Sequence, residues 1–203
     1  YSAGRQPVPQ MGRELRCATL GVIGYGQISR YLCPLAAAFG LRVLVNDPFL
    51  PAHETDVRST DLADLLAQSD YVVCLAPANA ETENLMNAAA FARMKPGAFF
   101  VNASRGNLVD DTALLDALNS GHLAGAALDV GRAPDQMPSL ALASHPRVLA
   151  SPHIGGLTLP AIEHQSLETV AQTDSILRGQ APVGAVNADA AHRLANLKTT
   201  AKV

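Results

Sequence analysis

The 203-residue chain has no long basic run and carries a formal net charge of −3. Nucleic acids and anionic membranes attract concentrated positive charge, so neither is expected as a partner. The chain also has no apolar stretch long enough to span a bilayer. Its first ten residues, YSAGRQPVPQ, are polar and contain proline, which does not fit a secretory signal peptide.

Cysteine is scarce as well: the sequence has only Cys17, Cys33 and Cys74, and no two of them form a Cys-x-x-Cys pair. An odd number of separated cysteines argues against a disulfide framework, and no Cys/His spacing suggests zinc. Cys74 lies in an apolar run, where a buried thiol is the ordinary interpretation. We therefore expect a reducing, cytoplasmic setting and no metal.

Short apolar runs alternate with helical patterns along most of the chain. The candidate strands are residues 18–24, 41–46, 71–76, 98–103, 124–130 and 147–151. The helical patterns cover residues 26–39, 60–68, 88–94, 111–119 and about 159–178. Strands buried on both faces of a parallel sheet have few polar residues, as these do. The alternation predicts an α/β fold with a doubly wound parallel sheet.

The first apolar run leads into a glycine-rich turn, LGVIGYGQIS, and Asp47 follows the second run. In a dinucleotide-binding βαβ unit, Gly24 would make the tight turn and Gly26 would let the backbone approach a pyrophosphate. Asp47 would accept hydrogen bonds from a ribose. The third glycine of the G-x-G-x-x-G pattern is replaced by Ser29, and a motif of this kind is weak without support from other residues.

Three further residues follow predicted strands: Arg105, Asp129 and His153. Ligands of open α/β sheets bind at the carboxyl ends of the strands, where these side chains are expected. Arg105 could clamp a carboxylate with two hydrogen bonds, and His153 could act as an acid or base near neutral pH. Each also has a simpler interpretation: a surface arginine, a turn aspartate and a turn histidine bonded to the backbone.

Together these pieces resemble the D-2-hydroxyacid dehydrogenases, a family that includes phosphoglycerate dehydrogenases and glycerate or glyoxylate reductases. The resemblance runs from about Gly12 to Asn187. The matching segments are GRELRCATLGVIGYGQIS, NDPF, ARMKPGAFFVNASRG, LVDDTALLDALNSGHLAGAALDV and SPHIGG, in the family's order. This combination is far more specific than the glycine-rich turn by itself.

The resemblance implies a Rossmann domain that binds NAD and transfers a hydride between nicotinamide and a small 2-oxo or 2-hydroxy acid. Arg105 matches the family's catalytic arginine and His153 its general acid/base, while Asp129 matches the residue that holds the carboxamide. Asp47 favours NAD because a 2′-phosphate would meet its negative charge. The residues expected at the cofactor are Gly24, Tyr25, Gly26, Gln27, Ile28, Asp47, Leu75, Ala76, Pro77, Thr82, Ala103, Ser104, Arg105, Asp129, His153 and Gly155. The family also pairs through its cofactor domains, which implies a homodimer.

The chain departs from the family pattern in the segment that normally carries a glutamate partner for the histidine, D-V-F-E-x-E-P. Here the segment is DVGRAPDQMP, with Pro134 at the glutamate position. Asp135, the nearest carboxylate, is the candidate replacement as a third catalytic residue.

The family also carries a substrate-binding domain before its cofactor domain, and nothing before Gly12 can form one. We therefore expect a linker at residues 1–16, a dinucleotide-binding domain at 17–156, a long helix and return segment at 157–187, and a tail at 188–203. Such a chain is expected to bind dinucleotide but to turn over poorly.

Two other functions remain open. One is an NAD-sensing binding module, as in related transcriptional corepressors, which the missing glutamate and substrate domain both favour. The other is a methyltransferase that uses S-adenosylmethionine on a similar turn, in which Arg105, Asp129 and His153 would have no natural role.

Overall fold

A computed structural model describes residues 11–50, 57–185 and 188–193 of the chain. The chain divides into two compact units, and the boundary between them in the sequence falls after His153. The first unit holds the sheet and its helices, and the second holds one long helix.

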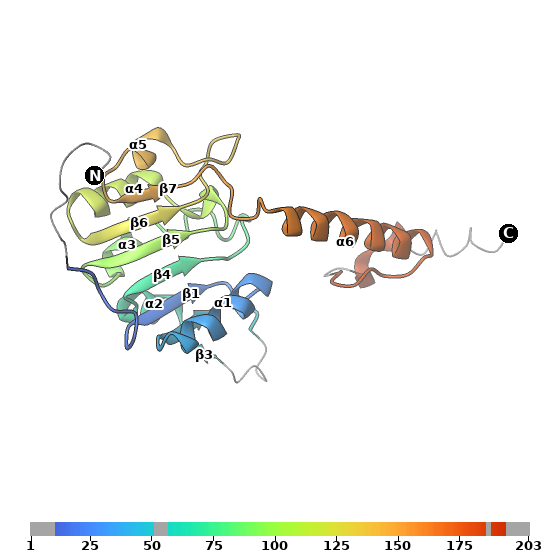
Figure 1. Ribbon diagram of the computed structural model, residues 1–203, viewed down its shortest axis with the longest axis horizontal. Helices are drawn as coiled ribbons and strands as arrows, with labels where there is room; N and C mark the ends of the chain where they lie inside the picture. Colours follow the sequence, from blue (N-terminus) through green and yellow to red (C-terminus); the bar gives the residue numbers. More distant parts are fainter. Residues whose placement is uncertain (1–10, 51–56, 186–187, 194–203) are drawn as a thin grey trace. The chain divides into compact units, whose positions relative to one another are not determined.

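The described residues of the first unit form a seven-stranded parallel sheet in the order β3-β2-β1-β4-β5-β6-β7 (Figure 1). The strands are β1 (Thr19–Ile23), β2 (Arg42–Asn46), β3 (Arg58–Ser59), β4 (Tyr71–Cys74), β5 (Ala98–Asn102), β6 (Leu123–Leu128) and β7 (Val148–Ala150). The predicted doubly wound α/β fold is confirmed. β3 was outside the prediction because it is only two exposed residues long and has no apolar run. The strand order reverses between β1 and β4, which is where such sheets bind ligands.

Helices in the first unit connect successive strands. They are α1 (Gln27–Ala38), α2 (Leu62–Gln68), α3 (Ala88–Arg93), α4 (Asp111–Asn119), α5 (Leu140–Ala143) and the 3-10 turn η1 (Gly106–Leu108). The Asp61 side chain accepts a hydrogen bond from the Asp64 amide at 2.8 Å, so α2 begins at Leu62 rather than at residue 60. α5 is too short for a helical period to reveal it in the sequence.

Two groups of buried apolar side chains hold the helices to the sheet. The smaller group lies under α1 and includes Val22, Cys33 and Val45. The larger group includes Cys74 and Phe100 with side chains from α2, α3, α4 and α5. Burial raises the pKa of the Cys33 and Cys74 thiols to about 11, so both remain neutral thiols near pH 7.

The second unit contains α6 (Leu159–Leu177) and the short turn η2 (Ala188–Ala190). Thr158 caps the helix by accepting a hydrogen bond from the Ala161 amide at 3.3 Å. None of residues 159–177 is buried. Within the described part of the chain, no helix is both long enough and apolar enough to cross a membrane.

Asp70 joins three elements at the amino ends of the strands, and this network predicts a pH-dependent stability. Its carboxylate accepts hydrogen bonds from the Thr19 amide at 2.8 Å and from the Lys95 ammonium group. Burial by itself would raise the pKa of Asp70, but the hydrogen bonds from Lys95 and Thr19 outweigh it and lower that pKa. A lowered pKa stabilises the fold above the unfolded-state value of about 3.9, and this stability is lost as the pH falls through the folded-state value.

We therefore expect Asp70→Asn to lower the free energy of unfolding by about 1 kcal/mol at pH 7. The difference from the wild type should shrink as the pH falls below about 4, since the wild-type carboxyl is then protonated too. Urea denaturation at several pH values measures both effects. Asp174→Asn, at an exposed ion pair on α6, is the matched control and should change little. A difference that is the same at every pH would contradict the assignment.

Candidate active site

The glycine-rich turn after β1 needs each of its two glycines for a different reason. Gly24 has a φ of +89°, and a Cβ there would lie 2.7 Å from the Cα and N atoms of Ala76. Only glycine fits this position. A Cβ at Gly26 would meet nothing within 4 Å. Gly26 is also the N-cap of α1, and no side chain caps the helix there.

Ser29, at the third position of the glycine pattern, is fully buried. Its hydroxyl donates a hydrogen bond to the Gly24 carbonyl at 2.6 Å. The serine therefore fastens the first turn of α1 to the tight turn before it. The glycine pattern by itself gives no sign of this bond.

Asp47 lies directly after β2 and links that strand to the glycine-rich turn. Its carboxylate accepts hydrogen bonds from the Tyr25 amide at 2.7 Å and the Phe49 amide at 2.8 Å. A carboxylate has about four lone-pair positions, so Asp47 keeps capacity to accept from two ribose hydroxyls.

These features fit a dinucleotide. The uncapped N-terminus of α1 presents amide donors and the positive end of the helix dipole, which suits a pyrophosphate. The open space beside Gly26 allows the anion to approach the backbone. Gln27 and Ile28, the first residues of α1, are both exposed beside this space.

The segment after β4 is fastened to its neighbours on both sides. The Leu75 amide donates to the Ile23 carbonyl at 2.8 Å, and the Ser104 hydroxyl donates to the Ala76 carbonyl. Thr82 closes the following turn through a hydrogen bond from its hydroxyl to the Pro77 carbonyl at 2.7 Å. Hydrogen bonds therefore link the three segments that carry the expected cofactor residues at the ends of β1, β4 and β5.

Arg105 follows β5 on a turn that a buried asparagine holds in place. The Asn102 side chain donates to the Arg105 carbonyl at 2.9 Å and accepts from the Ser104 amide at 3.1 Å. The Arg105 side chain is exposed, and its guanidinium donates to the Ser104 carbonyl at 2.7 Å. Asn102 is outside the expected set of site residues; a buried amide at a strand end is the signal that could have revealed it.

Asp129 and Ser151 meet at the ends of β6 and β7. The Ser151 hydroxyl donates to the Asp129 carboxylate at 2.7 Å. Both residues line a cavity of about 190 Å³, to which Ala103 also contributes. Ser151 is a second residue outside the expected set, and it orients a carboxylate that the sequence did select.

His153 has a φ of +54°, in the left-handed region that non-glycine residues rarely occupy. Its amide donates to the Ser151 carbonyl at 3.0 Å, which fixes this tight turn after β7. Strained backbone of this kind is often found where a side chain must be aimed at a ligand.

Among the described residues, no hydrogen bond joins Asp135 to His153. The Asp135 carboxylate instead accepts from the Met137 amide at 3.0 Å, within its own turn. Gln136 has a φ of +59° in this turn, and its amide donates to the Ala133 carbonyl at 2.7 Å. Gly155, the remaining expected cofactor residue, belongs to the second unit.

Comparison with known proteins decides the family. The profile of "D-isomer specific 2-hydroxyacid dehydrogenase, NAD binding domain" matches residues 2–155. The chain belongs to this family. Its cofactor is accordingly NAD, as the glycine-rich turn and Asp47 predicted.

Individual relatives agree with the family. The chain is 39% identical over 187 residues to D-3-phosphoglycerate dehydrogenase 1 of Saccharomyces cerevisiae, covering 86% of this chain and 40% of that protein. A glyoxylate reductase structure from Paecilomyes thermophila has a TM-score of 0.76 at 32% identity, covering 82% of this chain and 51% of that one. A D-lactate dehydrogenase from Aquifex aeolicus, solved with NAD and lactic acid, has a TM-score of 0.75 at 31% identity, covering 87% and 58%. The chain therefore spans between 40% and 58% of the length of these relatives.

Proposed function

We propose that the chain is the cofactor-binding part of an NAD-dependent oxidoreductase that interconverts a small 2-oxo acid and its D-2-hydroxy acid. The observation that carries the proposal is the placement of Arg105, Asp129 and His153 within three residues of the carboxyl ends of the neighbouring strands β5, β6 and β7. The glycine-rich turn lies at the same edge of the sheet. A cation, a carboxylate and an imidazole beside a dinucleotide turn suit hydride transfer to a carbonyl.

Each side chain has a separate part in the proposed reaction. Arg105 would bind the substrate carboxylate and carbonyl through paired hydrogen bonds and fix their orientation. His153 would donate a proton to the forming hydroxyl during reduction and remove it during oxidation. Asp129, oriented by Ser151, would accept from the carboxamide of the nicotinamide. NAD, when bound, supplies the hydride donor and acceptor.

We further propose that the domains are divided as the sequence indicates, with a linker at 1–16, a cofactor domain at 17–156, a return segment at 157–187 and a tail at 188–203. A cytoplasmic location is supported by the free thiols of Cys17, Cys33 and Cys74.

A homodimer through the cofactor domain is also part of the proposal. An apolar stripe along α1 and its C-cap supports it: Tyr31, Leu35 and the C-cap Phe39 repeat at helical spacing and remain 78%, 60% and 68% exposed. Exposed apolar stripes of this kind are typical of protein interfaces. Sedimentation velocity measures the oligomeric state directly.

The NAD-sensing module is the second candidate, and the position of Asp135 favours it. Its carboxylate accepts a hydrogen bond from the Met137 amide in its own turn, and in the described part of the chain no hydrogen bond joins it to His153. A protein that binds NAD without transferring a hydride would not need such a bond.

Ligand binding and turnover separate these functions. We expect NADH, at about one hundred times its Kd, to stabilise the chain by about 2.7 kcal/mol in a thermal shift assay, and S-adenosylmethionine to have no effect. In the protein at its full natural length, we expect glyoxylate, pyruvate or hydroxypyruvate to cause loss of NADH absorbance. NADH binding without turnover of any 2-oxo acid would support the sensing module. Stabilisation by S-adenosylmethionine alone would overturn both.

A further inference from the structure

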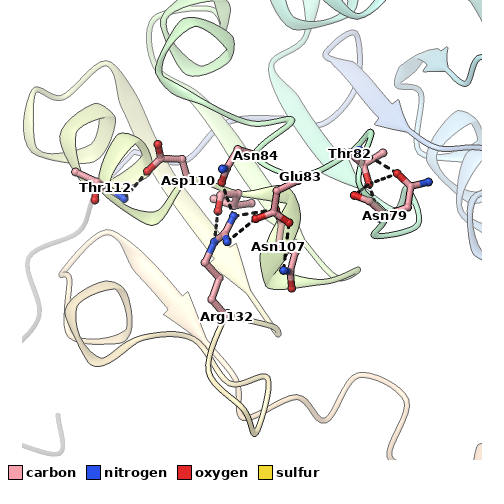
Figure 2. Close-up of polar contacts among 9 residues, drawn as sticks. Asn79, Thr82, Glu83, Asn84, Asn107, Asp110, Thr112 and Arg132 are labelled. Carbon is pink, nitrogen blue, oxygen red and sulfur yellow. Dashed lines mark hydrogen bonds and ion pairs between the residues drawn. The ribbon is translucent and has the colours of Figure 1, made fainter.

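Arg132 lies at the centre of a hydrogen-bond network at the carboxyl edge of the sheet, and this network has no part in the function proposed so far. Its Nε donates to the Val109 carbonyl at 2.9 Å, and one terminal nitrogen donates to the Glu83 carboxylate at 2.8 Å. The other terminal nitrogen donates to the Asn107 carbonyl at 2.9 Å and to the Asn84 side chain. Figure 2 shows the guanidinium pointing into this group of acceptors.

The acceptors come from two segments of the chain, and Arg132 comes from a third. Glu83 and Asn84 follow β4, Asn107 and Val109 follow β5, and Arg132 follows β6. These three strands are neighbours in the sheet. The guanidinium therefore fastens together three consecutive loops at the edge where the proposed substrate binds.

Glu83 contributes a charge to the network. Hydrogen bonds from Arg132 and from the Asn107 side chain lower the pKa of the Glu83 carboxyl. Since an arginine is also always charged in proteins, Arg132 and Glu83 form an ion pair at neutral pH. Lysine could carry the same charge, but it lacks the planar fork that reaches four acceptors at once.

The loops after β5 and β6 also touch without any side chain between them. A Cβ at Gly106 would lie 2.0 Å from the Gly131 carbonyl carbon and 2.4 Å from the Arg132 nitrogen. Gly106 immediately follows Arg105, and Gly131 immediately precedes Arg132. A displacement of the Arg132 loop is therefore passed directly to the backbone that carries Arg105.

We propose that Arg132 is a positioning residue that fixes the Arg105 segment, and that it thereby sets the affinity of the site for the carboxylate of a 2-oxo acid. This inference rests on the proposed function. Arg132 bonds to the carbonyls two and four residues beyond Arg105, while Asn102 holds the Arg105 carbonyl itself; the exposed Arg105 side chain bonds only to the neighbouring Ser104 carbonyl among the described residues. A guanidinium on a loosened turn would meet a carboxylate in the correct geometry less often.

The network is better suited to fixing geometry than to stabilising the fold. Arg132 and Glu83 keep 33% and 41% of their side-chain area exposed. Ion pairs at this exposure contribute little to stability, because solvent screens them. Removing the guanidinium should therefore change the melting temperature by only a few degrees.

The test uses the protein at its full natural length, with NADH bound, and oxamate as an unreactive analogue of a 2-oxo acid. Arg132→Met keeps the aliphatic stem and removes the guanidinium. We expect it to raise the oxamate Kd and the KM for the 2-oxo acid about tenfold or more, with kcat changed less than threefold. Binding of NADH should be unchanged. Arg132→Lys should restore part of the lost oxamate affinity. Glu83→Gln should raise the oxamate Kd by a smaller factor and leave the melting temperature unchanged.

Arg16→Met is the matched control, because Arg16 pairs with Glu14 at an exposed site away from the three loops. It should leave every constant unchanged. If the wild type binds NADH and oxamate and Arg132→Met binds both equally well, the inference is wrong while the proposed function stands. If the wild type binds neither ligand, the proposed function itself fails. A fall in kcat with KM unchanged would also contradict a role in positioning Arg105.

Discussion

Gly26→Val should abolish measurable NADH binding and leave the fold intact. The side chain would occupy the open space at the N-terminus of α1, where a Cβ meets no protein atom within 4 Å. The backbone there is extended, with φ −87° and ψ −163°, which valine adopts without strain. We expect the NADH Kd to rise about a hundredfold or more, equivalent to about 2.8 kcal/mol, because the pyrophosphate could no longer reach the backbone amides.

Fluorescence titration with NADH measures the Kd, and thermal unfolding shows whether the fold is intact. Gly12→Val is a suitable control, because a Cβ at Gly12 also meets nothing within 4 Å but lies outside the turn. It should change neither the Kd nor the melting temperature. A Gly26→Val protein that binds NADH with wild-type affinity would mean that the dinucleotide does not use this turn.

A substitution at Gly24, two residues earlier, should also destabilise the fold. Its positive φ would cost alanine about 1–2 kcal/mol, and the added Cβ would also collide with the backbone of Ala76. Relief of that collision requires β1 and the segment after β4 to separate. The loss of binding in Gly24→Ala would therefore accompany a loss of stability, whereas in Gly26→Val it would not.

The sequence alone predicted the features of this protein that depend on local pattern. The apolar runs predicted six of the strands, and the expected position of Arg105, Asp129 and His153 just beyond the carboxyl ends of strands agrees with the structure. In contrast, β3 and α5 are too short to show a period. The family could be recognised because its motifs are contiguous stretches of sequence.

Contacts between loops could not be predicted in the same way. Arg132 is 49 residues from Glu83 and 25 from Asn107, and no local pattern relates arginines to acceptors at such distances. Asp135 shows the converse. Its sequence position suggested a partner for His153, and this stays a prediction: in the structure the carboxylate accepts from the Met137 amide in its own turn, where Gln136 has a left-handed conformation.

His153→Asn should reduce the rate of 2-oxo acid reduction about 10²- to 10⁴-fold, the usual contribution of a general acid. Asparagine is the informative substitution because it tolerates the left-handed conformation that His153 adopts, with φ +54°. Alanine tolerates it less well, so its effects on the backbone and on proton transfer would be mixed. Asparagine can still donate a hydrogen bond to a carbonyl oxygen, but it cannot give up a proton near neutral pH.

The decisive measurement is kcat in the protein at its full natural length, with the NADH Kd and the melting temperature determined alongside. Both of these should match the wild type, since the backbone turn formed by the His153 amide and the Ser151 carbonyl is retained. His164→Asn, on the exposed surface of α6, is the matched control and should keep full activity. A His153→Asn protein with more than a tenth of the wild-type kcat would exclude His153 as the proton donor. Such a result would leave the oxidoreductase assignment in place and would require another group as the proton donor.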